Sequence, residues 1–309
     1  MQYRPLGTTG LNVSVMALGG AAIGQQYGPV SVSDAADTVH AGIDAGINFI
    51  DTSAFYGEGQ SESILGEVLT GGWREKVILC TKAGRFTREK FDFSAKGMRE
   101  CFEGSLRRLK TDHVDVLLAH DIEYATDKNQ VFTETAELLH QLKAEGKTRF
   151  IGMSALPLAV LKDAIAKCSL DVIISYCHYH LQDQTLLTDL LPMAQQHGVG
   201  VLNASPLAMG LLTHQGPPPW HPASDRLKQA CRFAAEYCER RGKDLSTLGM
   251  QFCFREERIP STITGTAKQS ELKVNLRAMN EPLDKVLLSE VQSILEPVMN
   301  QTWPSGVSS

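Results

Sequence analysis

The sequence reads GINFIDTSAFY at residues 46–56, LCTK at 79–82, VDVLLAHD at 114–121 and FIGMS at 150–154. Each stretch contains an apolar run that leads into a polar residue. This pattern is typical of the strands of a parallel β-barrel, because both faces of such strands are buried and their carboxyl ends meet at one face of the barrel. The polar residues at the four strand ends are Asp51, Lys82, His120 and Ser154.

Short β-like runs alternate with longer amphipathic segments along the chain, which predicts a closed (β/α)8 TIM barrel of the α/β class. Strands are expected at Val15–Leu18, Asn48–Asp51, Val77–Thr81, Val114–Leu118, Arg149–Met153, Val172–Ser175, Val199–Ala204 and Thr262–Thr264. Helices are expected at Ser33–Ala45, Ser61–Leu69, Ser94–Leu109, Val131–Glu145, Leu156–Lys167, Leu186–Gln196 and Asp225–Arg241. An open doubly wound sheet is the alternative, but it would need a glycine-rich phosphate-binding motif after its first strand. We therefore predict a single barrel domain over residues 1–309.

Three segments fall outside the β/α repeat. Tyr3–Leu6 and Val13–Val15 flank the turn sequence GTTG, and we expect them to form a hairpin that plugs the bottom of the barrel. The prolines of Thr213–Ser224 exclude a helix and predict a long loop after the seventh strand, where barrels place active-site loops. Asn300–Ser309 is expected to be an irregular tail.

Composition excludes several classes of protein. The net charge of −5, with scattered lysines and arginines, argues against a nucleic-acid partner. No run approaches the roughly 20 apolar residues that a membrane span needs, and the N-terminal sequence MQYRPLGTTG does not resemble a signal peptide. Seven cysteines at irregular spacing indicate reduced thiols rather than a disulfide framework. We expect a cytoplasmic monomer or weak homodimer that acts on a small molecule, without a membrane partner.

Four of the polar residues near strand ends can build a proton-transfer site. Tyr56 follows Asp51 by five residues, and a free tyrosine titrates near about pH 10, so it needs a neighbouring cation to act as an acid or base. Lys82, at the end of the next strand, would supply that cation, and Asp51 would hold it in place. His120 would donate a hydrogen bond to a substrate oxygen from the other side. Such a site suits hydride transfer, because the charge on the oxygen changes as the hydride moves.

Each of these residues also has a structural interpretation. Asp51 alone can cap a helix, and His120 alone can be a hydrogen-bonded core histidine. Cys177, His178 and His180 suggest a metal, but the alternation of side chains along a strand would place them on different faces. No metal site is therefore expected.

The chain resembles the aldo-keto reductase family over almost its whole length. The motifs that carry the resemblance are LGTTGLNVSVMALGG (6–20), GINFIDTSAFYG (46–57), LCTKAG (79–84), KTRFIGMS (147–154), ASPLAMGLL (204–212) and ITGTAKQSELKVNL (263–276). The resemblance implies a catalytic tetrad of Asp51, Tyr56, Lys82 and His120. In it Tyr56 would be the general acid and base, and Lys82 would lower its pKa. Asp51 would pair with Lys82, and His120 would orient the substrate.

The resemblance also implies a nicotinamide cofactor that lies across the top of the barrel without a Rossmann glycine motif. The residues it would place at the cofactor are Gly20, Asp51, Ser154, Tyr176, Ser205, Leu207, Gly210, Ile263, Gly265, Thr266, Gln269, Glu271 and Asn275. The chain departs from the family pattern after the seventh strand, where Ala204 replaces an aromatic residue that stacks on the nicotinamide in many members. Tyr176 stands where many members have glutamine, and its ring is a candidate replacement. Ala155 follows Ser154 where asparagine is common.

Glu271 bears on the choice between NAD and NADP. Members that use NADP usually have arginine at this position, which binds the 2′-phosphate by a charge-assisted hydrogen bond. A carboxylate would repel that phosphate and would accept a hydrogen bond from a free 2′-hydroxyl. The sequence therefore predicts NAD over NADP, although Lys268 or Lys273 would weaken the preference if either reached the phosphate.

Within the family the chain is most similar to dehydrogenases that act on L-galactose, L-fucose or D-threo-aldoses. The similarity lies in SYCHYHLQD (175–183), ASPLAMGLLT (204–213), GPPPWHPAS (216–224) and LEPVMNQTWPSG (295–306). It implies oxidation of an aldose at C1 to its lactone, with Tyr56, His120 and Trp220 at the substrate. The alternatives are an NADP-dependent carbonyl or aldehyde reductase and a cofactor-sensing regulatory subunit.

Overall fold

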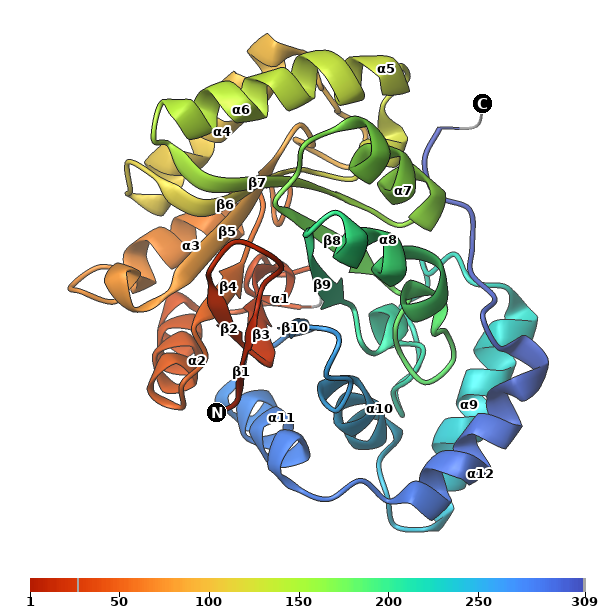
Figure 1. Ribbon diagram of the computed structural model, residues 1–309. Coiled ribbons are helices and arrows are strands. Elements are labelled where there is room, and N and C mark those ends of the chain that lie inside the picture. The colour runs from red at the N-terminus through yellow and green to blue at the C-terminus, as the bar shows by residue number, and fades with distance from the viewer. Residues whose placement is uncertain (27, 308–309) are drawn as a thin grey trace.

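The computed structural model describes residues 1–26 and 28–307 of the chain. In these residues eight parallel strands close into a barrel in the order β10-β3-β4-β5-β6-β7-β8-β9. The strands are β3 (Met16–Gly19), β4 (Phe49–Asp51), β5 (Ile78–Ala83), β6 (Val114–Ala119), β7 (Thr148–Ala155), β8 (Val172–Tyr176), β9 (Gly200–Ala204) and β10 (Ser261–Gly265). Each predicted strand lies within two residues of an observed one, and the predicted (β/α)8 barrel is confirmed (Figure 1).

Helices surround the barrel on all sides (Figure 1). They are α1 (Gly20–Ile23), α2 (Val32–Asp44), α3 (Gln60–Val68), α4 (Ala95–Leu109), α5 (Lys128–Gln130), α6 (Ala136–Ala144), α7 (Leu158–Lys167), α8 (Leu191–Gln196), α9 (Asp225–Arg240), α10 (Leu245–Phe254), α11 (Gln269–Asn280) and α12 (Lys285–Leu295). Serine or aspartate side chains accept backbone N–H groups at the starts of α2, α4, α9, α10 and α12, which satisfies donors that a helix leaves unpaired.

Two predicted helices are interrupted, and others were not predicted. One turn of π-helix separates α5 from α6 at Val131–Thr135, and another precedes α8 at Leu186–Leu190. Pro192 lies in the first turn of α8 and has no N–H to donate, so the helix restarts there. After residue 241 we predicted no helix, whereas the described residues contain α10, α11 and α12. Helix α10 is buried on most of its surface and therefore lacks an amphipathic period.

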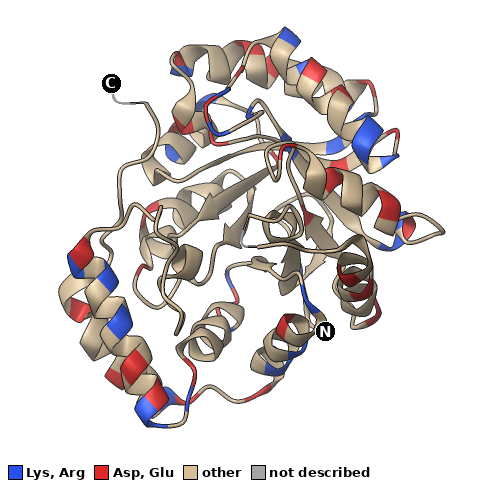
Figure 2. Ribbon diagram, turned by 180° about the vertical axis from the view of Figure 1, so that it is seen from behind, with Lys and Arg blue, Asp and Glu red and all other residues tan. Residues whose placement is uncertain are grey.

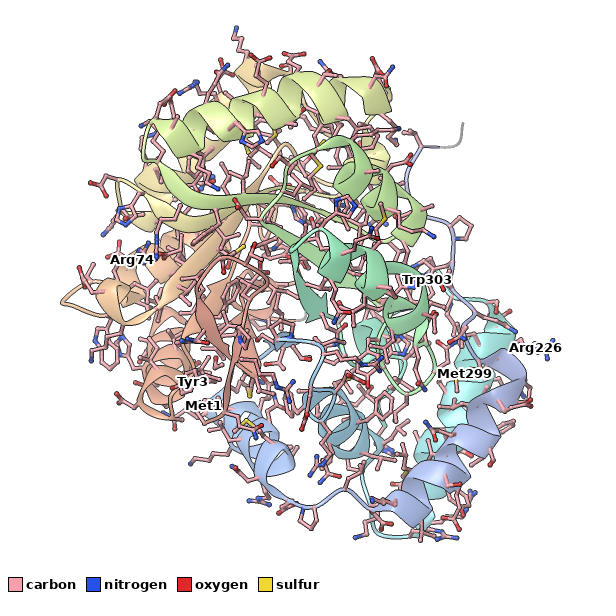
Figure 3. The ribbon with its side chains drawn as sticks, viewed as in Figure 1. Met1, Tyr3, Arg74, Arg226, Met299 and Trp303 are labelled. Atoms are coloured by element: carbon pink, nitrogen blue, oxygen red, sulfur yellow. The ribbon has the colours of Figure 1, made fainter. Side chains whose placement is uncertain are left out.

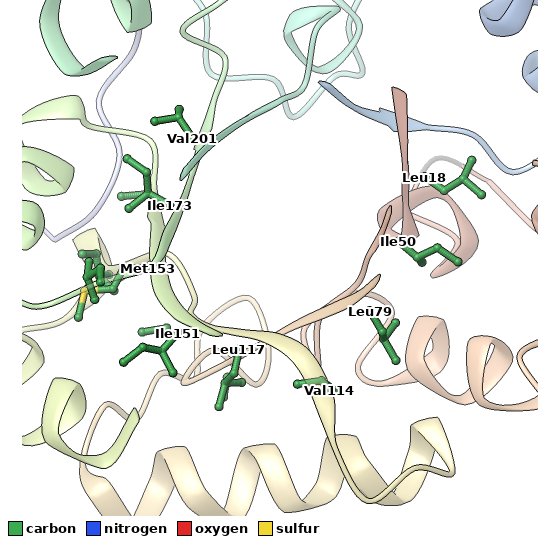
Figure 4. Packing of buried hydrophobic residues seen from close by; sticks show 14 of the residues in the cluster. Leu18, Ile50, Leu79, Val114, Leu117, Ile151, Met153, Ile173 and Val201 are labelled. Atoms are coloured by element: carbon green, nitrogen blue, oxygen red, sulfur yellow. The ribbon is translucent and has the colours of Figure 1, made fainter. Parts of the chain in front are cut away.

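The core has an inner and an outer layer. Alternate strand residues point outward against the helices, as Figure 4 shows for Leu18, Ile50, Leu79, Leu117, Ile151, Ile173 and Val201. The other strand residues fill the barrel interior, where Leu6, Leu11 and Val13 of the N-terminal hairpin join them. The hairpin pairs β1 (Tyr3–Pro5) with β2 (Asn12–Ser14) and covers one end of the barrel, as predicted. The carboxyl ends of the strands lie at the opposite end.

After α12 the C-terminal segment runs along one side of the molecule (Figure 1), and its Ser305 hydroxyl donates to Glu123 in the loop after β6. Arg226 of α9, Met299 and Trp303 lie on the same side of the molecule (Figure 3), and the Arg226 guanidinium donates to the carbonyl of Pro297 at 3.0 Å. Residues 300–307 form neither helix nor strand, in agreement with the predicted tail, and Ser308 and Ser309 lie outside the described residues. The predicted loop at Thr213–Ser224 likewise contains only turns and bends.

The surface carries charges of both signs, mainly on the outer faces of the helices (Figure 2). Within residues 1–26 and 28–307, no helix has the length and apolar character that crossing a membrane requires. All seven cysteines are free thiols, and six of them are buried.

Candidate active site

The four residues of the expected tetrad meet at the carboxyl end of the barrel. Asp51 ends β4, Lys82 lies near the end of β5, and His120 directly follows β6. The Lys82 ammonium donates to the Asp51 carboxylate at 2.7 Å, to the Thr52 carbonyl at 2.9 Å and to the Tyr56 hydroxyl at 2.9 Å. Lys82 is 2% exposed and Asp51 3%. The structure thus places a buried cation in hydrogen-bond contact with a phenol.

His120 approaches the phenol from the neighbouring strand. Its ring is perpendicular to that of Tyr56, with the centroids 5.6 Å apart. Its Nδ1 lies 2.7 Å from the hydroxyl of Ser53, a residue that sequence reasoning missed although it stands two positions after Asp51. Because a hydroxyl can donate to Nδ1, the Nε2 atom is free to carry the proton and donate it to a ligand. The Nε2 atom lies 3.6 Å from a carboxylate oxygen of Asp121.

Burial keeps the imidazole of His120 neutral. Burial lowers its pKa well below the usual value, and the positive charges of Lys82 and Arg85 lower it further. A neutral imidazole donates one hydrogen bond and accepts one, so His120 can hold an oxygen without protonating it.

Burial and Lys82 act on the pKa of Tyr56 in opposite directions. Burial raises this pKa above its usual value, and the opposing effect of the Lys82 ammonium is smaller. The Lys82 ammonium lowers this pKa, as expected, but burial of the phenol raises it by more than one nearby cation lowers it. Burial also disfavours the charge on Lys82 itself, yet Asp51, Tyr56 and Cys80 together outweigh burial, and the pKa of Lys82 lies above its usual value. Lys82 therefore stays charged.

The residues expected near the nicotinamide lie at the same end of the barrel. Ser154 is the penultimate residue of strand β7, and its hydroxyl accepts a hydrogen bond from the N–H of Asp121 at 3.2 Å. Tyr176 ends β8, and its hydroxyl donates to the Glu123 carboxylate at 3.0 Å. The Tyr176 ring is thus held in a fixed position. Whether it stacks on a nicotinamide stays a prediction.

The residues expected near the cofactor phosphates follow β9 and β10. The loop after β9 has positive φ angles at Ser205, Ala208, Met209 and Gly210. Within this turn the N–H groups of Ala208 and Gly210 bond to the carbonyls of Ser205 at 2.9 Å and Leu207 at 3.0 Å. Gly265 ends β10 and is exposed, and a Cβ atom there would meet only Ala22, at 3.9 Å. The residues expected near the cofactor phosphates are therefore placed as follows: Ser205, Leu207 and Gly210 lie after β9, and Ile263, Gly265 and Thr266 lie in or directly after β10.

Three of the expected cofactor residues already have structural partners. One oxygen of Glu271 accepts the N–H groups of Ala267 at 2.9 Å and Lys268 at 3.2 Å, which caps the start of α11. Asn275 donates to the Thr266 hydroxyl at 3.1 Å, and Gln269 donates to the Asp37 carbonyl at 3.4 Å. Glu271 is exposed, so its carboxylate lies at the surface at the start of α11.

Two expected site residues, Gly20 and Trp220, have different surroundings. A Cβ atom on Gly20 would lie 2.5 Å from the Ser61 hydroxyl, so close packing explains the glycine without a cofactor. Trp220 lies in the loop after β9, 47% exposed, and stacks beside His221.

Two buried carboxylates beside the tetrad were absent from the sequence-based site. Asp121 is 4% exposed and forms an ion pair with Arg85. Glu123 is 2% exposed, and the same oxygen accepts hydrogen bonds from Leu156 N–H at 3.1 Å, the Tyr176 hydroxyl at 3.0 Å and the Ser305 hydroxyl at 2.9 Å. Asp121 is the last residue of the VDVLLAHD run, and this position directly after His120 could have identified it as a candidate site residue.

Glu123 is expected to make the protein less stable as the pH rises. Burial, with the charge of Asp121, raises its pKa to about 7. A carboxyl whose folded-state pKa exceeds its unfolded value near 4.5 binds more protons when folded, so the free energy of unfolding falls as pH rises from about 4.5 to above 7. The loss is roughly 3 kcal/mol. Urea unfolding of Glu123→Gln and wild type at pH 5 and pH 8 measures it. The variant should gain stability relative to wild type at pH 8, and parallel pH profiles would contradict the prediction.

Comparison with known proteins agrees with this geometry. Residues 15–296 match the model of the Aldo/keto reductase family. The chain is 46% identical to L-galactose dehydrogenase of Arabidopsis thaliana, over 99% of this chain and 98% of that protein. It is 31% identical to D-arabinose 1-dehydrogenase of Saccharomyces cerevisiae, over 96% and 95% of the two chains. Among solved structures it is similar to the holo form of an aldo-keto reductase from Bacillus halodurans, with a TM-score of 0.80, 26% identity and 98% of each chain covered.

Proposed function

Because the chain belongs to the aldo/keto reductase family, we propose that it oxidises an aldose of the L-galactose or L-fucose type at C1. The products are the lactone and a reduced nicotinamide dinucleotide. The observation that carries the proposal is the Lys82 ammonium, 2.7 Å from Asp51 and 2.9 Å from the Tyr56 hydroxyl, at the end of the barrel that the hairpin leaves free. The near full-length similarity to L-galactose dehydrogenase supports the choice of substrate.

Each member of the tetrad has a distinct part in the proposed reaction. Tyr56, as tyrosinate, takes the proton of the anomeric hydroxyl while C1 gives up its hydride and the C1–O bond becomes a carbonyl. The ammonium of Lys82 stabilises the tyrosinate at 2.9 Å, and Asp51 keeps that ammonium charged. The Nε2 atom of neutral His120 donates a hydrogen bond to the reacting oxygen. When bound, nicotinamide dinucleotide supplies the hydride acceptor and a positive charge beside the site.

The carboxyl end of the barrel fits an extended dinucleotide. The turn at Ser205–Gly210, in which the N–H groups of Ala208 and Gly210 bond to carbonyls of the turn itself, would lie beside the pyrophosphate, and the start of α11 adds the positive end of a twelve-residue helix. Exposed Gly265 lets a ligand approach the backbone between them. Ser154 and Tyr176 would border the nicotinamide.

We favour NAD over NADP because of Glu271. Its carboxylate is exposed at the start of α11, where it would repel a 2′-phosphate, and only one of its oxygens is engaged in capping the helix. The second oxygen is available to a ribose hydroxyl. The seven free thiols fit the reducing conditions of the cytoplasm, where we place the protein.

Initial rates with a panel of sugars and both nucleotides test the proposed function. We expect the absorbance of the reduced cofactor to grow with NAD and L-galactose or L-fucose, and kcat/KM to be at least about tenfold lower with NADP, the effect of one unfavourable charge contact. A clear preference for NADP would contradict the role of Glu271 but not that of the tetrad. NADPH oxidation by simple aldehydes without aldose oxidation would favour a carbonyl reductase. Tight nucleotide binding without turnover would favour a regulatory subunit.

A further inference from the structure

We infer that Asp121, held by Arg85, is a specificity-determining residue that accepts a hydrogen bond from the sugar hydroxyl beside the reacting carbon. The enzyme would then select aldoses with a free 2-hydroxyl. This inference rests on the proposed function, and it identifies the 2-hydroxyl as a group of the substrate that the same site binds.

The position of Asp121 relative to His120 carries the inference. Nδ1 of His120 is occupied by Ser53, so Nε2 is the atom that faces the reacting oxygen. The Asp121 carboxylate oxygen that pairs with Arg85 lies 3.6 Å from that Nε2 atom. The oxygens on adjacent carbons of a sugar are separated by about one hydrogen-bond length. A sugar whose O1 is bound to His120 therefore brings O2 within reach of Asp121.

The backbone and its neighbours hold Asp121 in this position. Its φ and ψ angles of 52° and 55° are left-handed, a conformation that non-glycine residues adopt rarely and that is concentrated at functional sites. Its N–H donates to Ser154, and its carboxylate pairs with the guanidinium of Arg85. The left-handed turn therefore keeps the carboxylate beside His120.

Arg85 is itself fixed by aromatic rings. Its guanidinium carbon lies 3.6 Å from the centre of the Phe55 ring, and 5.2 Å and 5.3 Å from those of Phe91 and Tyr124. Phe91 and Tyr124 stack on each other with their centroids 4.7 Å apart. Such contacts restrict a long side chain and stabilise its charge. The rings of Phe55, Phe91 and Tyr124 thus hold the Arg85 guanidinium beside Asp121.

A buried carboxylate within β6 shows what a purely structural carboxylate looks like. Asp115, near the start of β6, accepts Leu79 N–H at 2.9 Å and pairs with Arg149 at 2.7 Å and Arg74 at 3.0 Å. Both of its oxygens are engaged by the protein, at the amino end of the strand, away from the tetrad. Asp121, at the other end of β6, lies beside the histidine that faces substrate. Asp115 is therefore the matched control.

The test compares an aldose with its 2-deoxy analogue. For whichever of L-galactose and L-fucose the wild type oxidises faster, we expect kcat/KM to fall about 10- to 100-fold when the 2-hydroxyl is removed, as for a hydrogen bond to a charged group. In Asp121→Asn this ratio should shrink to about threefold or less, because a neutral amide oxygen accepts more weakly. Asp115→Asn should keep the wild-type ratio.

The outcomes separate this inference from the proposed function. Equal kcat/KM for the two sugars in the wild type would overturn the inference without any variant. An unchanged ratio in folded Asp121→Asn would also overturn it and leave Asp121 as a structural partner of Arg85. A protein that oxidises no aldose with either nucleotide would contradict the proposed function and, with it, the inference.

Discussion

Replacing Tyr56 by phenylalanine is expected to lower kcat for aldose oxidation by about 10³-fold, the middle of the range for loss of a general acid or base. The change deletes only the hydroxyl that lies 2.9 Å from Lys82. The ring can keep its perpendicular contact with His120, and Lys82 keeps its bonds to Asp51 and Thr52. Nucleotide affinity should therefore change by less than about threefold, since the lost group makes no other contact. Steady-state rates and fluorescence titration with NADH measure the two quantities.

Tyr3→Phe is the matched control, because it makes the same chemical change at the other end of the barrel. The Tyr3 hydroxyl donates to the carbonyl of Gly46, and the residue lies in the hairpin. Its kcat should equal that of the wild type. If Tyr56→Phe retained full activity, another group would have to take the anomeric proton, and the assigned role would be wrong.

The location of the tetrad was predictable because strand ends are visible in the sequence. The runs before Asp51 and His120 are mostly apolar, with Asp115 as the charged exception, which indicates buried parallel strands. The carboxyl ends of such strands lie at one face of the barrel, so polar residues that end successive strands are expected to lie close together. The distances of 2.7 Å and 2.9 Å around Lys82 could not be read from that order, but the convergence could.

Other features depend on partners that are far apart along the chain. Ser305 and Tyr176, which donate hydrogen bonds to Glu123, are 182 and 53 positions away from it in the sequence. No local sequence pattern therefore predicts that Glu123 is buried near the site. The pKa of Tyr56 depends on how completely water is excluded around it, and burial decides its direction. Helix α10 also escaped prediction, because an element that is buried on most sides shows no polar face. The sequence thus predicts what strands and their ends dictate, and it leaves open what tertiary packing decides.

Lys82→Met is expected to abolish turnover and to destabilise the fold at the same time. The ammonium is the cation that opposes the high pKa of Tyr56, so its loss raises that pKa further and makes the tyrosinate harder to form during turnover. Aldose oxidation should fall by at least about 10²-fold, and any residual rate should shift to higher pH. The Asp51 carboxylate, 3% exposed, would lose its charged partner. Breaking a buried ion pair costs about 3–5 kcal/mol of unfolding free energy.

The double variant Asp51→Asn/Lys82→Met distinguishes the two effects. A neutral side chain at position 51 removes the unpaired charge, so the free energy of unfolding should recover much of the loss, while turnover should stay absent because no cation faces Tyr56. Urea unfolding of the two single variants and the double variant gives the coupling free energy of the pair. A double variant as unstable as Lys82→Met would show that lost packing of the long lysine chain, rather than the buried charge, caused the destabilisation. Recovery of activity together with stability would show that Tyr56 does not depend on Lys82, which would remove the physical basis of the proposed proton transfer.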